Sequence, residues 1–221
     1  MPRCRRKTAA LDPAMPVIGL LVIMVMPARG LPAAAAGEPS PGEVRTGLFG
    51  LEADGSRFVY LIDRSASMAA AEGGPLAAAK RELIRSLDDL GRVQQFQVIA
   101  YNQRLSHFRP TGGRRGLAFG DESNLRRAVR FIESIRADGA TRHAPAIDAA
   151  LALAPDTIFL LTDADAPDDL EREEFERLAE RLGGTRMLVV QFGPPGGVCS
   201  PRLAALAERS GGRYRSVSVD P

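Results

Sequence analysis

The sequence predicts an α/β domain in which helices cover both faces of a mainly parallel, doubly wound sheet with one antiparallel edge strand. Three short apolar runs, at 58–62, 157–162 and 186–192, lack the alternation of a half-exposed strand, so each is expected to be buried on both faces. Helical patterns separate the runs, which is typical of parallel strands joined by crossovers. Right-handed crossovers place the helices on both sides of the sheet.

The first 36 residues have the pattern of a leader. Residues 1–7 (MPRCRRK) are cationic, and the apolar run at 16–26 is shorter than the roughly 18 residues of a spanning helix. Small residues at Ala34 and Ala36 suit a cleavage site, which favours a cleaved export signal over an uncleaved anchor. Either reading places the domain outside the cytoplasm, where it would be secreted, periplasmic or anchored to the membrane. We expect contact with the membrane only through an uncleaved leader.

The first half of the domain contains four further elements. Residues 37–49 are a linker and lead-in to a domain at 50–221, and 44–53 either pair at the sheet edge or cover the base of the domain. Residues 95–101 form a second strand, and 104–109 return beside it as the antiparallel edge strand. A proline in the first turn opens a helix whose apolar positions repeat at helical spacing: Pro75, then Leu76, Ala79, Leu83, Leu87 and Leu90.

The second half alternates helices with strands. Asp121 and Ser123 both suit the N-cap of a helix with inward positions Leu125, Ala128, Val129, Ile132 and Ile135. Pro145 opens a short helix after the loop at 136–143, and an amphipathic helix ends at Gly183-Gly184. A last helix begins at Ser200-Pro201, and 214–219 alternate as a closing strand.

Charge and cysteine content exclude several functions. The leader holds five of the 29 basic residues and one of the 27 acidic ones, which leaves 24 and 26 for the rest. A near-neutral domain gives no support for nucleic-acid binding. Cys4 and Cys199 form no zinc pattern with histidine. His107 is expected in the edge strand and His143 in a loop, both away from any nucleophile pattern.

Polar side chains follow two of the buried strands directly. Asp63, Ser65 and Ser67 come after the first, and Asp163 after the strand at 157–162. The carboxyl ends of parallel strands share one edge, where α/β sheets bind ligands, and the loop that carries Thr141 can reach it. These are all oxygen donors, which suit Mg²⁺, or else Mn²⁺ or Ca²⁺.

A simpler interpretation exists for each residue. Aspartate and serine are common turn residues and could only cap the next segment, and Thr141 could be the N-cap of the short helix. The position of D-x-S-x-S straight after a buried strand, and of T-D after another, favours the metal site.

With this context, D-x-S-x-S, the threonine loop and T-D resemble the von Willebrand factor A domain and its metal-ion-dependent adhesion site. The resemblance covers roughly Gly50 to the C-terminus. FGLEADGSRFVYLIDRSASM, FIESIRADGATRHAPAIDAALALAPDTIFLLTDAD and ERSGGRYRSV are similar to exported bacterial A-domain proteins, many from planctomycetes.

The resemblance implies a role for each site residue. Ser65 and Ser67 would ligate the metal directly, Thr141 directly or through water, and Asp63 and Asp163 would hold coordinating waters. The sequence departs from the family pattern where alanines replace common glycines: Ala66, Ala164 and Ala140. We expect a tighter loop from the first two and a less certain position for the threonine from the third.

The sequence therefore predicts a non-enzymatic binding module in which the metal coordinates an Asp or Glu of a protein partner. One alternative is a cell-envelope scaffold with a vestigial metal site. A Mg²⁺-dependent phosphohydrolase with an aspartyl nucleophile is less well supported, because such enzymes resemble D-x-D-x-T. Here Arg64-Ser65 places no second carboxylate two residues after Asp63, and no obvious lysine follows.

Overall fold

The computed structural model describes residues 39–69, 74–110, 116–163, 166–193 and 200–218. The predicted leader, both cysteines and Ala164 lie outside these residues. Among the helices that are described, none is both long enough and apolar enough to cross a bilayer.

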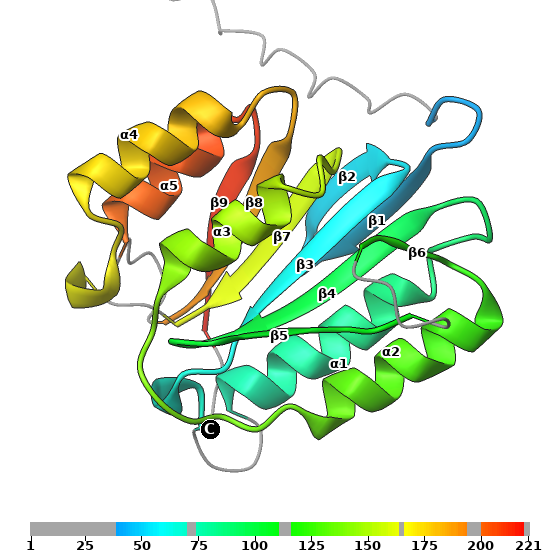
Figure 1. Cartoon of the computed structure of the whole chain (residues 1–221), viewed down its shortest axis with the longest axis horizontal. Helices are drawn as coiled ribbons and strands as arrows, with labels where there is room; N and C mark the ends of the chain where they lie inside the picture. The colour runs from blue at the N-terminus through cyan, green and yellow to red at the C-terminus, as the bar shows by residue number, and fades with distance from the viewer. Residues whose placement is uncertain (1–38, 70–73, 111–115, 164–165, 194–199, 219–221) are drawn as a thin grey trace, which may run out of the picture. The chain divides into compact units, whose positions relative to one another are not determined.

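A central sheet has the strand order β5-β4-β3-β7-β8-β9 (Figure 1). The parallel strands are β3 (Arg57–Asp63), β4 (Gln95–Tyr101), β7 (Thr157–Thr162), β8 (Arg186–Phe192) and β9 (Arg213–Val217). β5 (Leu105–His107) runs antiparallel at the edge and contains His107 as expected. This confirms the predicted fold class. β6 (Ala118–Phe119), a second antiparallel partner of β4, was not predicted, because two residues carry no recognisable pattern.

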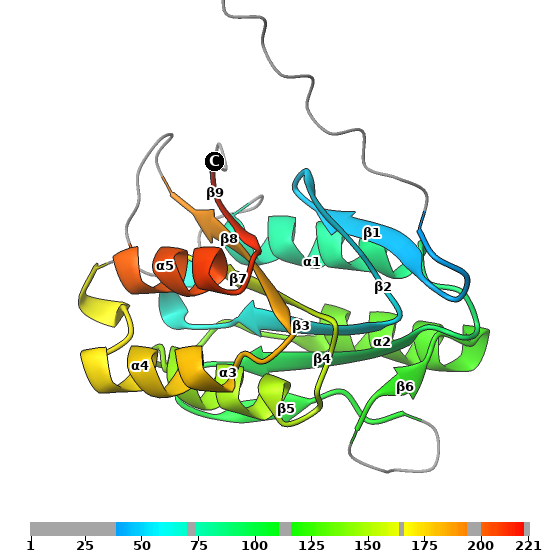
Figure 2. The same ribbon diagram turned by 90° about the horizontal axis from the view of Figure 1, so that it is seen from above.

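Helices cover both faces of the sheet (Figure 2). One face carries α1 (Pro75–Leu87) and α2 (Glu122–Ser134), and the other carries α3 (His143–Leu151), α4 (Arg172–Arg181) and α5 (Pro201–Arg209). Two short 3-10 helices, η1 (Ala66–Met68) and η2 (Ala166–Asp168), follow β3 and β7. Successive side chains of β3 enter opposite cores, Tyr60 one and Leu61 the other, and both are fully buried.

The segment before β3 forms a separate hairpin of β1 (Val44–Leu48) and β2 (Leu51–Gly55). Its turn has positive φ at Phe49 and Gly50, the backbone of a two-residue hairpin loop. Thr46 Oγ1 donates to the Ser86 carbonyl of α1 at 3.0 Å. Of the two expectations for this segment, pairing at the edge of the main sheet is therefore wrong, and the hairpin covers α1 instead.

The strand register brings the predicted site residues to one edge. Asp63, the last residue of β3, pairs with Tyr101 at the end of β4, and Ile62 pairs with Leu161 of β7. The carboxyl ends of β3 and β7 are therefore level, and the residues that follow them emerge side by side.

Candidate metal site

Hydrogen bonds connect the polar residues at this edge into a chain. Thr162 Oγ1 donates to Asp63 Oδ2 at 2.6 Å, and the Ser65 backbone N–H donates to Asp63 Oδ1 at 2.8 Å. Ser65 Oγ lies 3.0 Å from Ser67 Oγ, which donates to Asp163 Oδ1 at 3.0 Å. The structure thus brings four of the five predicted residues together across two strands.

Asp63 is the buried centre of this chain. Its side chain is 0 % exposed, and burial raises the pKa of its carboxyl group to about 6. The hydrogen bonds from Thr162 and Ser65 lower that pKa, and the negative charge of nearby Asp163 raises it again. Two neighbouring carboxylates, one fully buried, make a local environment that a cation would stabilise.

The loop that carries Thr141 is tied to the serine loop. The Ala66 N–H donates to the Gly139 carbonyl at 2.9 Å, and the Asp138 N–H donates to the Arg64 carbonyl at 2.8 Å. Thr141, two residues after Gly139, is half-buried, and its side chain forms no hydrogen bond with the part of the chain that is described. The N-cap of α3 is Arg142, so the interpretation of Thr141 as that cap is wrong.

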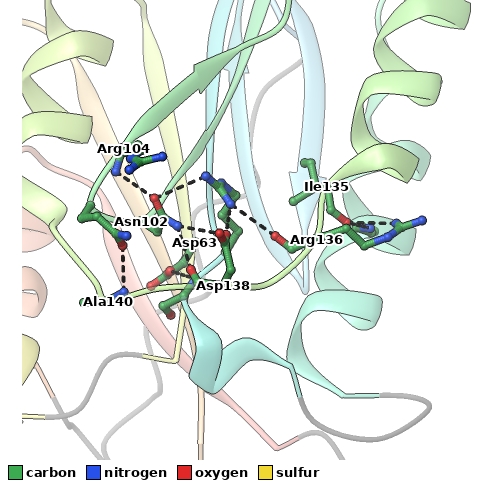
Figure 3. Close-up of polar contacts among 11 residues, drawn as sticks. Asp63, Asn102, Arg104, Ile135, Arg136, Asp138 and Ala140 are labelled. Atoms are coloured by element: carbon green, nitrogen blue, oxygen red, sulfur yellow. Dashed lines mark hydrogen bonds and ion pairs between the residues drawn. The ribbon is translucent and has the colours of Figure 1, made fainter.

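Polar side chains from the β4–β5 turn brace the threonine loop (Figure 3). Asn102 Nδ2 donates to the Asp138 carbonyl at 2.7 Å and to its Oδ1 at 3.0 Å, and Arg64 forms an ion pair with the same carboxylate. Gln103 Oε1 accepts from the Ala140 N–H at 2.8 Å. Sequence reasoning missed these supporting contacts, because no local pattern indicates which loop the turn contacts.

Tyr101, which pairs with Asp63 in the strand register, forms a buried contact with His143. Tyr101 Oη and His143 Nδ1 are 2.9 Å apart, and both side chains are almost fully buried. Burial lowers the pKa of His143 to about 4 and raises that of Tyr101 well above its usual value, so both are neutral at pH 7. The expectation of a loop position for His143 is wrong, because α3 begins at this residue, two positions before Pro145.

Comparison with known proteins identifies the family. The family model for the von Willebrand factor type A (VWA) domain matches residues 56–216. The chain belongs to this family. VWA domains often mediate metal-dependent protein interactions. Comparison with curated proteins gives no significant match.

Solved structures agree with the VWA fold. A von Willebrand factor type A protein from Catenulispora acidiphila superposes with a TM-score of 0.63 at 21 % identity, over 76 % of this chain and 40 % of that chain. BatB from Bacteroides thetaiotaomicron gives 0.57 at 20 % identity, over 75 % and 92 %. Proximal thread matrix protein 1 from the mussel byssus, with a zinc-occupied MIDAS motif, gives 0.52 at 13 % identity, over 80 % and 45 %. At these identities the likeness establishes the fold alone.

The donor set of this VWA domain fits a small hard cation. Two ligands at right angles around Mg²⁺, each about 2.1 Å from the ion, are about 3.0 Å apart. Ser65 Oγ and Ser67 Oγ have this separation, as do Ser67 Oγ and Asp163 Oδ1. No group of three or more His, Cys, Asp or Glu side chains that could hold a metal occurs in the described ranges.

Proposed function

We propose that this VWA domain is a divalent-cation-dependent protein-binding module. Ser65, Ser67 and Thr141 would hold Mg²⁺, or else Mn²⁺ or Ca²⁺, with Asp63 and Asp163 orienting the hydroxyl groups and coordinating waters. The observation that carries the proposal is the hydrogen-bonded chain from Thr162 to Asp163, because it sets hydroxyl oxygens at the spacing of adjacent metal ligands.

The partner would supply a carboxylate. A bound cation with mostly neutral direct ligands keeps much of its charge, so an Asp or Glu side chain is a strong final ligand. The chain's own residues orient the site and exclude water on the side of the buried Asp63. None of these roles includes a bond-breaking step, and we propose that the protein is not an enzyme.

The surroundings of the site make the cation necessary for such a partner. A pocket of about 260 Å³ beside Thr141 is lined by four carboxylates, those of Asp168, Asp169, Glu171 and Glu174, and by one arginine, Arg142. This charge and that of Asp163 would repel a carboxylate on a partner when no metal is bound. We therefore expect binding of a partner carboxylate at the metal site to be lost in EDTA.

The first test is thermal unfolding of the full chain in EDTA and in millimolar Mg²⁺ or Mn²⁺. A cation at 100 times its Kd stabilises the folded state by about 2.7 kcal/mol, which raises the Tm of a domain of this size by about 5–10 °C. Ser65→Ala should abolish the shift, and Ser123→Ala, at an exposed position of α2, should retain it. A shift of equal size in Ser65→Ala and wild type would refute the assignment of the ligands.

The second test concerns the chemistry of the partner and the cellular location of the protein. An immobilised glycine-rich peptide with a single glutamate should retain the protein in Mg²⁺ and release it in EDTA, whereas the same peptide with glutamine should not retain it. We also propose that the protein is exported, either with its leader cleaved or anchored through it. Cell fractionation with N-terminal sequencing would locate it, and recovery of the unprocessed chain from the cytosol would contradict export.

One observation favours a scaffold with a vestigial site as the second candidate. Both oxygens of Asp63 already accept hydrogen bonds from the protein, so the folded loop is satisfied without a metal. In that case neither Mg²⁺ nor Mn²⁺ would shift the Tm of the wild type. Hydrolysis of a generic phosphate ester that is lost in Asp63→Asn would instead favour the phosphohydrolase.

A further inference from the structure

A groove runs between the edge strand β5 and helix α2. It consists of two adjoining hollows of about 340 and 400 Å³ that share Phe131. Neighbouring residues of β5 line them in turn, His107 the first and Ser106 the second. Because the hollows meet at one side chain and follow one strand, the groove suits an extended segment rather than a compact ligand.

Three arginines surround the first hollow: Arg109 after β5, and Arg127 and Arg130 on α2. All three are exposed. None of them forms an ion pair with a carboxylate in the ranges that the structure describes. Within the described residues, the Arg127 side chain donates to the Arg109 backbone carbonyl alone, at 3.4 Å. The groove therefore carries positive charge that the described part of the protein does not neutralise.

This arrangement is unfavourable for α2 itself. Arg127 and Arg130 are three positions apart, and Arg126 and Arg130 are four apart, so like charges are neighbours on the helix surface. Like charges at such spacing destabilise a helix. Among the described residues, Arg126 has a compensating partner, Glu122, and the other two arginines of α2 have none. A ligand that supplies negative charge would remove this repulsion.

The floor of the groove is apolar. Phe108 is 2 % exposed and packs against Phe131, with ring centroids 6.2 Å apart. Phe131 remains half-buried where the two hollows meet. Such a floor can contact an apolar side chain. The arginines above it can donate two hydrogen bonds to a carboxylate in a bidentate pair.

We propose that the β5–α2 groove is a docking site for an extended acidic protein segment that also carries apolar side chains. The segment would place carboxylates on Arg109, Arg127 and Arg130 and an apolar side chain on Phe131. Nucleic acid fits less well, because the basic cluster is short, the rest of the domain is near neutral, and the floor is aromatic but mostly buried. The first hollow, where the arginines lie, contains none of the candidate metal ligands, and binding there needs no cation.

The test measures fluorescence anisotropy of a labelled peptide of about twelve residues, two glutamates for every leucine, with the full chain in EDTA. EDTA removes any contribution of the metal site. Loss of two exposed ion pairs corresponds to about a ten-fold weaker Kd in Arg127→Glu/Arg130→Glu. The matched control, Arg172→Glu/Arg209→Glu, makes the same charge change at exposed positions of α4 and α5 and should leave Kd unchanged.

A replacement variant and two further controls complete this experiment. If the glutamate variant does not fold, Arg127→Gln/Arg130→Gln serves in its place. The proposal requires that raising the salt concentration and replacing glutamate by glutamine in the peptide both weaken binding. No binding by wild type, equal loss in the control variant, or tighter binding of a single-stranded DNA of equal length would overturn it.

Discussion

Replacing Thr162 by valine tests the link between the buried carboxylate and the sheet. Valine has the shape of threonine, so Thr162→Val creates no cavity and removes only the hydroxyl group. That hydroxyl donates to Asp63 Oδ2 at 2.6 Å, and both side chains are 0 % exposed. A hydrogen bond to a charged group contributes about 1.5–3 kcal/mol, and the buried oxygen would be left unsatisfied. We expect the variant to unfold about 4–10 °C lower in EDTA.

The same strand offers a matched control. Thr157, at the other end of β7, is also 0 % exposed, but its hydroxyl group has no hydrogen-bond partner among the described residues. Thr157→Val therefore removes a buried polar group that is not satisfied, and its stability should equal or exceed that of the wild type. The difference between the two variants measures what the Thr162 hydroxyl group contributes through its hydrogen bond to Asp63 and its interaction with Tyr101.

Thermal and urea unfolding of the full chain, followed by circular dichroism, would measure this difference. Equal stability of Thr162→Val and Thr157→Val would refute the reasoning, because it would mean that Asp63 does not depend on Thr162. In Mg²⁺ the stabilisation of Thr162→Val should also be smaller than that of the wild type, since the orientation of Asp63 is relaxed.

Three further predictions concern the loops and the end of the sheet where β3 and β7 begin. Gly139 has a φ of +75°, and an added Cβ would meet the Gln103 side chain. Gly139→Ala should therefore cost about 1–2 kcal/mol and weaken Mg²⁺ binding. Adding Gln103→Ala should restore only part of this loss, and full recovery in titrations would show that the backbone is not strained. Asn102→Ala removes two bonds to Asp138 and one from the Arg104 N–H, so urea unfolding should show a loss of about 2–3 kcal/mol. A wild-type midpoint would contradict the bracing role. Asp156 Oδ2 accepts from the Ser56 and Arg57 N–H groups at 2.8 and 2.9 Å, and Asp156→Ala should lower stability by about 2–3 kcal/mol without changing the Tm shift that Mg²⁺ causes. A reduced metal shift in this variant would mean that the two edges of the sheet are coupled.

Local pattern was enough to predict the parallel strands of the central sheet, the helices and the edge that gathers the polar residues. The buried runs lie at β3, β7 and β8, and α1 begins at Pro75 as expected. Asp121 is the N-cap of α2, accepting from the Asn124 N–H. These features follow from side-chain periodicity and capping chemistry, which are properties of neighbouring residues.

Contacts between distant segments decided the rest. The β1–β2 hairpin covers α1, where Thr46 forms a hydrogen bond with Ser86, 40 positions away. The threonine loop is held by hydrogen bonds with Asn102 and Gln103 of another turn. The burial of His143 and the gathering of three arginines at the β5–α2 groove likewise depend on which elements pack together. The sequence alone thus determined the fold class and the candidate ligands. Only the tertiary structure decided how those ligands are supported, because side chains that are far apart in the sequence carry no local signal of their contact.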